Sequence, residues 1–293
     1  MNRLTGVFST FLMATNLVVN FVLLYIMGFL KVLAGLLRIR RLESALTRHM
    51  DLIIDSWAGV NRILFRVCRL TEVDVQWHDA EDLSRKGWYM VLSNHQTWTD
   101  ILLLQTALVG RIPPIKFFTK RQLLWVPFLG AAMWLLGFPY VRRMSRAQIA
   151  SNPELLELDR QATLAACLGF KHHPTTVLSF LEGTRFSPEK HGQQSSRYTN
   201  LLSPKVSGMA YVLTSLKDEL HCLIDVTIDY PCGVPTFWEF MKGECKQVDM
   251  QIRCREIPDD IANVGVNAIV AIKLTKNIWV NGSSTRAANR VST

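Results

Sequence analysis

Residues 94–100 combine residue types that can carry out acid–base chemistry. Their sequence, N-H-Q-T-W-T-D, follows an apolar run and precedes an apolar helical pattern. A histidine followed five residues later by an aspartate, at a strand-to-helix turn, can pair an imidazole with a carboxylate. Asp100 would then accept a hydrogen bond from Nδ1 of His95 and leave Nε2 as a general base. The alternative is a helix capping box formed by Thr97 and Asp100, and the two interpretations are compatible.

Two further segments carry arginines that could bind an anion. Residues 180–186, F-L-E-G-T-R-F, follow a predicted strand, and Arg185 offers a planar guanidinium for bidentate contact with phosphate. The competing interpretation is an Arg185–Glu182 ion pair in an ordinary loop. Residues 137–143, G-F-P-Y-V-R-R, bring two arginines after a short strand, and a solvated basic turn is the simpler explanation when this segment is taken alone.

Taken together, the motifs N-H-x4-D, G-x5-R and F-x-E-G-T-R resemble the glycerolipid acyltransferase family, best known from the PlsC-type 1-acyl-glycerol-3-phosphate acyltransferases. The resemblance covers roughly residues 88–231. It implies that His95 is the base and that Asp100 orients it. The stretch from Lys120 to Gly130 resembles the K-[RK]-x-L…P-x-x-G segment of the family. The resemblance therefore implies an acceptor-binding set made of Lys120, Arg143, Glu182, Gly183, Thr184 and Arg185.

Two features depart from the usual pattern of this family. The fourth motif reads D-V-T-I-D-Y over residues 225–230, without the usual proline. This form resembles the branch that contains the YihG-type bacterial proteins and some eukaryotic lysophospholipid acyltransferases. The Trp- and Lys-rich C-terminal helix of that branch has no counterpart after about residue 258. These departures bear on the choice of acceptor and acyl chain rather than on the reaction type.

The resemblance implies a reaction and its partners. An acyl thioester of coenzyme A or acyl-carrier protein would donate to the glycerol hydroxyl of a lysophospholipid. With 1-acyl-sn-glycerol-3-phosphate as the acceptor, the product is phosphatidic acid. Acyl transfer to another lysophospholipid and a non-catalytic, membrane-anchored protein that binds anionic lipid are the alternatives. No metal, cofactor or nucleic acid is expected, and the bacterial relatives imply the inner membrane of a bacterial cell.

The order of elements along the chain predicts an α/β fold that would position these motifs. Short apolar runs with strand character cover residues 73–77, 88–93, 115–119, 176–181, 222–229 and 248–254. Helical patterns cover residues 98–109, 121–136, 154–169 and 205–216, with Pro127 placed to kink the second. Strands that alternate with helices favour a largely parallel central sheet with flanking helices. The polar stretch 187–200 is expected to form a surface loop.

A hydrophobic segment at the N-terminus predicts membrane insertion. Residues 4–30 contain no Asp, Glu, Lys, Arg or His, and about 20 apolar residues already span the hydrocarbon core. The continuous apolar run over residues 17–30 favours a single crossing, and a re-entrant helical hairpin remains open, whereas a cleaved signal peptide fits poorly. The basic residues between Lys31 and Arg48 favour a cytoplasmic catalytic domain.

The predicted domain organisation has four parts. Residues 1–40 would insert into the membrane, and residues 41–69 would form an amphipathic helix that lies either on the catalytic core or on the bilayer. Residues 70–280 would form the acyltransferase domain, and residues 281–293 a flexible tail.

The cysteines, the net charge and the spacing of the histidines disfavour several other classes of protein. The six cysteines form no C-x-x-C pair, which disfavours a zinc ribbon or a disulfide framework. The net charge of +9 favours anionic partners. The basic residues are spread along the chain and form no nucleic-acid-binding motif, which disfavours a nucleic-acid-binding protein. A metal-dependent hydrolase using His95, Asp100, His172 and His173 is disfavoured, because adjacent histidines point in different directions.

Overall fold

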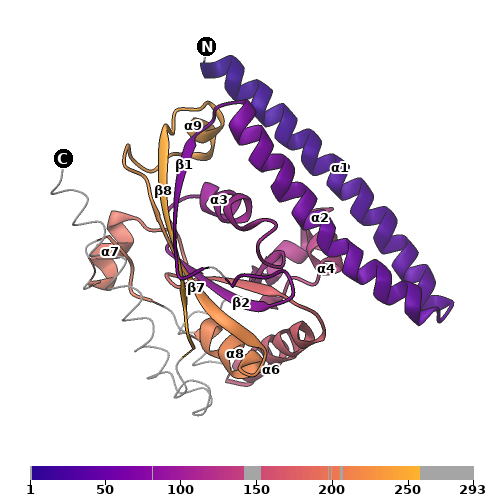
Figure 1. Ribbon diagram of the computed structural model, residues 1–293. Coiled ribbons are helices and arrows are strands. Elements are labelled where there is room, and N and C mark those ends of the chain that lie inside the picture. Colours follow the sequence, from indigo (N-terminus) through magenta and orange to yellow (C-terminus); the bar gives the residue numbers. More distant parts are fainter. Residues whose placement is uncertain are drawn as a thin grey trace.

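The computed structural model describes residues 2–80, 82–141, 153–196, 198, 200–204 and 207–257 (Figure 1). Its centre is a six-stranded sheet with the strand order β1-β8-β7-β2-β6-β3. The strands are β1 (Glu72–His78), β2 (Trp88–Ser93), β3 (Ile115–Phe117), β6 (Thr176–Phe180), β7 (Leu220–Asp229) and β8 (Gln247–Arg255). Strands β7, β2, β6 and β3 are mutually parallel, whereas β8 runs antiparallel to β7 and parallel to β1. The predicted α/β fold with a largely parallel sheet is confirmed.

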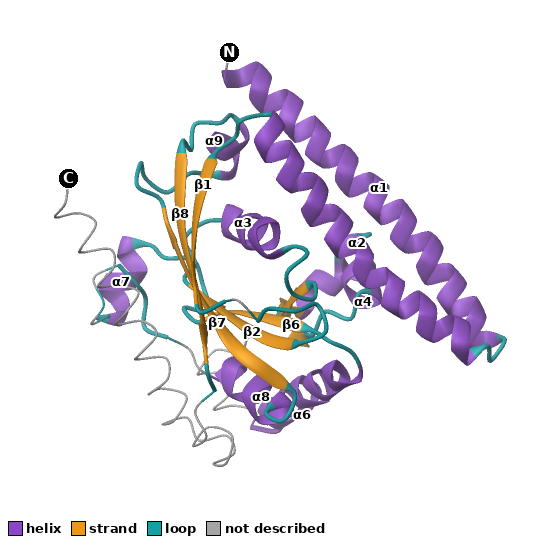
Figure 2. Cartoon of the chain, viewed as in Figure 1, coloured by secondary structure: helices purple, strands orange, loops and turns teal. Residues whose placement is uncertain are grey.

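Helices cover both faces of this sheet (Figure 2). On one face lies α3 (Thr99–Leu108), and outside it lie α2 (Arg40–Val67) and α1 (Asn2–Leu36). On the other face lie α6 (Pro153–Gly169) and α8 (Ser207–Leu216). Side chains of β2 alternate between the two cores, with Tyr89 and Val91 on the α3 side and Met90 and Leu92 on the other. The short elements are β4 (Thr119–Lys120), η1 (Arg121–Trp125), α4 (Leu129–Leu135), β5 (Tyr140–Val141), η2 (Phe170–His172), α7 (Pro188–Gln194) and α9 (Phe237–Met241).

Two predictions about secondary structure need correction. The helix expected over residues 121–136 is two pieces, η1 and α4, which Pro127 separates. At this break a Cβ on Gly130 would lie 2.2 Å from the carbonyl oxygen of Leu124, so the turn requires glycine. The loop expected over residues 187–200 contains helix α7. Ser187 caps this helix by accepting a hydrogen bond from the backbone N–H of Lys190, and Pro188 occupies its first turn.

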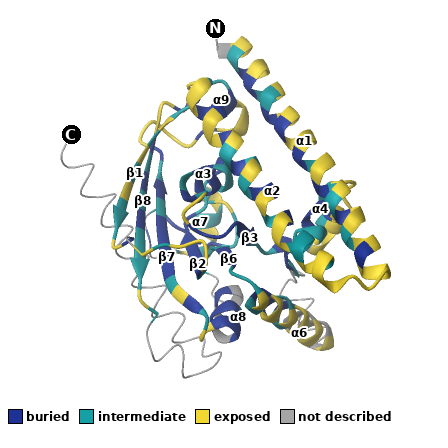
Figure 3. Cartoon of the chain, turned by 45° about the vertical axis from the view of Figure 1, so that its right-hand side comes forward, coloured by how far each residue is buried: buried dark blue, intermediate teal, exposed yellow. Residues whose placement is uncertain are grey.

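The N-terminal segment forms one continuous helix, α1, which passes Lys31 and ends at Leu36. Helix α2 then returns along it, so the two helices form a hairpin on the outside of the domain (Figure 1). Polar side chains of α1 point inward: Asn16 donates to Asn61 Oδ1 on α2 at 3.0 Å, and Ser9 donates to the carbonyl of Met241 at 2.6 Å. The outward side is apolar and exposed (Figure 3).

The inner face of α2 packs against the domain. Ile54, Leu64 and Phe65 are buried, and the latter two belong to the core beneath α3. The packing interpretation of residues 41–69 therefore describes the inner face of α2. Its outer side still exposes large apolar residues, namely Leu42, Leu52, Val60, Ile63 and Val67.

A small charged cluster lies where α2 meets β3. Nζ of Lys116 lies 3.1 Å from Oδ1 of Asp51, and Nε2 of His173 lies 3.5 Å from Oδ2 of the same carboxylate. Burial, followed by the charge of Lys116, lowers the pKa of His173 below its usual value, while Asp51 opposes the shift.

This lowered pKa predicts a loss of stability at acidic pH. Below about pH 6.5, the unfolded chain binds a proton at His173 that the folded protein does not bind, so stability falls until the pH reaches the lower folded pKa. Thermal unfolding between about pH 7 and pH 5 measures this, and His173→Gln should flatten the dependence over that range. The exposed His49 provides the control variant His49→Gln. An unchanged pH dependence in His173→Gln would contradict the assignment.

Candidate active site

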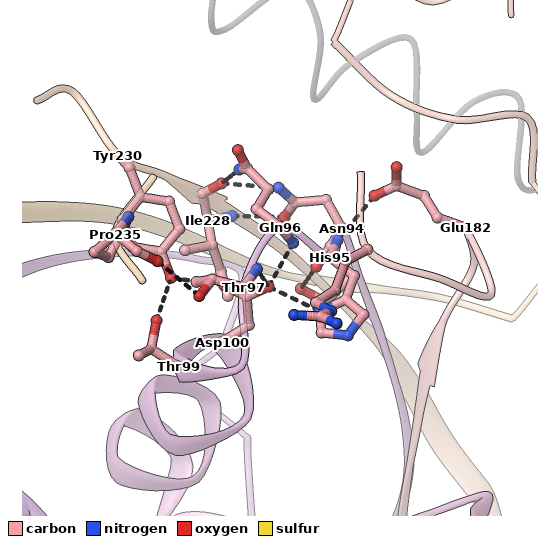
Figure 4. Close-up of polar contacts among 12 residues, drawn as sticks. Asn94, His95, Gln96, Thr97, Thr99, Asp100, Glu182, Ile228, Tyr230 and Pro235 are labelled. Atoms are coloured by element: carbon pink, nitrogen blue, oxygen red, sulfur yellow. Dashed lines mark hydrogen bonds and ion pairs between the residues drawn. The ribbon is translucent and has the colours of Figure 1, made fainter. Parts of the chain in front are cut away.

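The candidate site lies where three neighbouring parallel strands end at the same edge of the sheet. Strand β2 lies between β7 and β6. His95 follows the end of β2 by two residues, Glu182 follows the end of β6 by two, and Tyr230 directly follows β7. Ligands of open α/β sheets bind at the carboxyl edge of parallel strands, so the topology brings these side chains to a functional position (Figure 4).

His95 and Asp100 form a hydrogen-bonded pair. Nδ1 of His95 lies 2.9 Å from Oδ2 of Asp100, and the side chains are 14% and 1% exposed. The imidazole stacks on the ring of Phe180, with 4.0 Å between ring centroids and an interplanar angle of 14°. Because Nδ1 is bound to the carboxylate, Nε2 is the ring nitrogen available for proton transfer.

The same carboxylate shapes the turn before α3. Oδ2 of Asp100 also accepts the backbone N–H groups of Gln96 at 2.6 Å and Thr97 at 3.0 Å. The bond from Thr97 is one half of the capping box expected from the sequence. The other half is replaced by a backbone bond, because the N–H of Asp100 donates to the carbonyl of Thr97 at 3.3 Å, while the Thr97 hydroxyl donates to the carbonyl of Pro235 at 2.9 Å. Asp100 therefore combines a helix-terminal role with its bond to the imidazole.

Side-chain amides fix the His95 turn to the neighbouring strand β7. Asn94 donates to the carbonyl of Ile228 and accepts from the N–H of Ile228, both at 2.8 Å. Gln96 donates to the same carbonyl at 2.9 Å. These bonds replace the strand ladder where β2 ends, and they tie the backbone on both sides of His95 to β7.

Glu182 lies behind the His95 turn. Its Oε1 accepts the backbone N–H of His95 at 2.8 Å, its Oε2 accepts that of Leu202 at 2.9 Å, and the residue is fully buried. Gly183 has a φ of +66°, in the left-handed region that favours glycine, as the expected tight turn requires. Glu182 was expected to bind substrate, but these contacts hold the backbone of the candidate base.

Arg185 and Thr184 extend from the same turn. The guanidinium of Arg185 lies 4.9 Å from the centroid of the Trp98 ring, and this indole is 60% exposed. Lys190 donates to the hydroxyl of Thr184 and to the carbonyl of Arg185, both at 3.0 Å. Arg185 is therefore oriented beside the turn that carries His95.

The other predicted site residues have different placements. Lys120 ends the short strand β4, and its side chain lies outside the described part of the structure. Arg143 lies outside the described residues altogether. His173 precedes β6, at the opposite end of the sheet from His95, and contacts Asp51 and Lys116. The four residues considered for a metal site are thus not brought together.

The sequence motifs alone did not identify three residues of this site. Tyr230 donates to Oδ1 of Asp100 at 2.6 Å, Asn94 ties the turn to β7, and Trp98 stacks with Arg185. Tyr230 is the last residue of the D-V-T-I-D-Y motif, and Asn94 and Trp98 flank His95 within its own motif. Their positions within these motifs are the signal that the sequence offers. No spacing rule predicts which residue each of these side chains contacts.

Comparisons with known sequences agree with this geometry. A model of the Acyltransferase family matches residues 74–232. The 2-acyl-1-lysophosphatidylinositol acyltransferase of Saccharomyces cerevisiae is 26% identical over 217 residues, which cover 58% of this chain and 54% of that protein. The 1-acyl-sn-glycerol-3-phosphate acyltransferase 2 of Arabidopsis thaliana is 23% identical over 225 residues, which cover 71% and 51%. The chain thus spans about half the length of these two curated relatives.

A solved structure shares the fold. The crystal structure of the 1-acyl-sn-glycerophosphate (LPA) acyltransferase PlsC from Thermotoga maritima superposes with a TM-score of 0.55. The alignment covers 98% of each chain at 16% sequence identity, so it supports the architecture alone. Because the family model matches more than half of the sequence, this chain belongs to the Acyltransferase family.

Proposed function

We propose that this protein is a membrane-bound enzyme that transfers an acyl group from an acyl thioester to the free glycerol hydroxyl of a lysophospholipid. The observation that carries the proposal is the 2.9 Å bond between His95 Nδ1 and the buried carboxylate of Asp100, at the carboxyl edge of the parallel strands. Membership of the Acyltransferase family supports the reaction class.

In the proposed reaction, Nε2 of His95 takes the proton of the acceptor hydroxyl while its oxygen attacks the thioester carbonyl. The new C–O bond forms, the C–S bond breaks, and the leaving thiolate takes the proton back from the imidazolium. General base catalysis of this kind contributes about 10²–10⁴-fold to the rate. Asp100 stabilises the imidazolium as it forms, and the route needs no covalent acyl-enzyme.

Basic side chains around the turn would bind the phosphate of the acceptor. Arg185 can make a forked contact, and its stacking on Trp98 supports a fixed orientation beside His95. Arg143 and Lys120 would complete the basic set, with Gly183 and Thr184 shaping the turn. Binding the phosphate would turn a two-substrate encounter at the bilayer into an oriented one.

The first acceptor to test is 1-acyl-sn-glycerol-3-phosphate, which would give phosphatidic acid. A lysophosphatidylinositol is the second, because a yeast relative of this chain is named for that substrate. A panel of lysophospholipids, each with acyl-CoA and with acyl-acyl-carrier protein, read by mass spectrometry, tests the proposal. New diacyl product from a phosphate-bearing acceptor is expected. Binding of anionic lipid without turnover in any combination would favour the non-catalytic alternative.

The membrane part of the proposal is supported by α1 and its neighbours. Within the described residues, α1 is the one helix long and apolar enough to cross a bilayer. It turns Ser9, Asn16 and Asn20 inward and large apolar residues outward, as expected for a helix in lipid. Phe128, which is 71% exposed, lies against Tyr25 of α1 with 6.5 Å between ring centroids, and Trp125, three residues before it in sequence, is 83% exposed. The positive-inside rule would place the catalytic domain on the cytoplasmic side.

This proposal predicts that salt alone does not release the intact chain from vesicles, because hydrophobic insertion is not screened as charge is. Phe29→Glu, on the exposed side of α1, should weaken binding in a flotation assay. Leu158→Glu is the matched control, since it places the same charge on an exposed leucine of α6, across the sheet from α1 (Figure 3). Release of the wild-type protein at high salt would contradict insertion.

A further inference from the structure

The side chain of the residue that directly follows strand β7 reaches the carboxylate that holds the candidate base. The hydroxyl of Tyr230 donates to Oδ1 of Asp100 at 2.6 Å, while Nδ1 of His95 lies 2.9 Å from Oδ2 (Figure 4). Both Tyr230 and Asp100 are buried. The hydroxyl of Thr99 lies 3.2 Å from that of Tyr230 and is fully buried as well.

The two oxygens of Asp100 have different surroundings. Oδ2 is bound by three donors from its own turn: the ring of His95 and the backbone N–H groups of Gln96 and Thr97. In the part of the chain that the structure describes, Tyr230 is the donor to Oδ1. Rotation of the carboxylate about its Cβ–Cγ bond is therefore opposed at Oδ1 by a residue 130 positions away in sequence.

We propose that Tyr230 is a positioning residue for acyl transfer: its hydroxyl holds the Asp100 carboxylate in the orientation that binds His95. This inference rests on the proposed function, in which His95 is the general base. A buried carboxylate oxygen without a donor is unfavourable, so loss of the phenol should let the carboxylate turn and misalign the bond to Nδ1. Thr99, Tyr230, Asp100 and His95 then act as one chain of hydrogen bonds.

The phenol is suited to this role because it remains a donor. Burial, and then the charge of Asp100, raises the pKa of Tyr230 well above its ordinary value. Tyr230 therefore keeps its proton across the range in which the enzyme would work. The hydrogen bonds from the side chains of Asn94 and Gln96 to the carbonyl of Ile228 hold β7 at a fixed distance from the turn that carries Asp100.

The test compares Tyr230→Phe with Tyr89→Phe in the purified full-length protein. Tyr89 is equally buried and its hydroxyl accepts the N–H of Ser84, but it lies at the other end of β2. We expect Tyr230→Phe to lower kcat on the order of tenfold to a hundredfold, with both KM values unchanged, and Tyr89→Phe to leave kcat unchanged. Melting temperatures of both variants show whether unfolding contributes.

A double-mutant cycle separates positioning from a merely structural role. In an Asp100→Asn background, Tyr230→Phe should change kcat by about twofold or less, because the carboxylate that it positions is already gone. Losses that multiply in the double variant, or a normal kcat in Tyr230→Phe, would overturn the inference. If Tyr230→Phe cannot be purified, Thr99→Val replaces it: a lowered kcat at constant KM supports the chain, and a normal kcat overturns it.

His95→Ala, measured beside these variants, distinguishes a failure of the Tyr230 role from a failure of the proposed function. A silent Tyr230→Phe together with an inactive His95→Ala rejects the role of Tyr230 and leaves the proposed function standing. Full activity in His95→Ala rejects the proposed function, and the role of Tyr230 with it.

Discussion

His95→Ala is expected to abolish acyl transfer while the protein remains folded and bound to the membrane. The imidazole is the proposed base, so at least the factor of about 10²–10⁴ due to general base catalysis should be lost. The backbone of the turn should persist, because Glu182 and Asp100 hold its N–H groups at His95, Gln96 and Thr97. Turnover of purified enzyme and its melting temperature measure the two parts of this prediction.

The matched control for this variant is His221→Ala. His221 is exposed, stacks on Trp88 and lies at the other end of the sheet, so its removal should leave turnover unchanged. Asp100→Asn should reduce turnover less than His95→Ala, because the imidazole remains. Turnover close to wild type in His95→Ala would show that the base is assigned to the wrong residue.

Arg185→Lys should raise the KM for the acceptor by about tenfold to a hundredfold, with the donor KM little changed. Lysine keeps the charge but loses the planar fork and the stacking on Trp98. The expected loss corresponds to about 1–3 kcal/mol, the range for hydrogen bonds to charged groups. If the hydroxyl is also misplaced relative to His95, kcat falls as well.

The competing interpretation, a structural ion pair between Arg185 and Glu182, makes a different forecast. It predicts a lower melting temperature, normal acceptor kinetics and the same phenotype in a Glu182 variant. Arg111→Lys is the control, since Arg111 also lies over an indole, that of Trp77, 4.1 Å from its centroid. A lowered melting point with an unchanged acceptor KM in Arg185→Lys would reject the phosphate role.

The strands are predictable from the sequence because the residues that they bury lie in short apolar or alternating runs. The expected boundaries of β2 agree with the structure, and those of β7 and β8 agree within two residues, since apolar runs and alternation follow burial. Helix α7 was missed because its composition is polar throughout. The signal for this helix is the Ser187-Pro188 start, a capping residue followed by proline, which lies within a stretch whose polar composition predicts a loop.

The site was only partly predictable for a different reason. His95 and Asp100 are five residues apart, so their pairing follows from local geometry. The contact between Tyr230 and Asp100 depends on the order of β7 and β2 in the sheet, which no local pattern encodes. Glu182 was grouped with phosphate-binding residues through its motif, and its bonds to two backbone N–H groups became visible only in three dimensions.

The strand order also constrains how the protein can be made. β8 lies between β1 and β7, although β1 follows the N-terminal hairpin and β8 is the last described strand. During synthesis, the hairpin and β1 leave the ribosome first, and β1 has no sheet neighbour until about residue 255 has been added. β7 likewise keeps one edge open until β8 arrives. The unpaired N–H and C=O groups at an open strand edge can pair with a wrong strand or with another chain. The nascent chain is therefore most prone to aggregation before β8 pairs with β1 and β7.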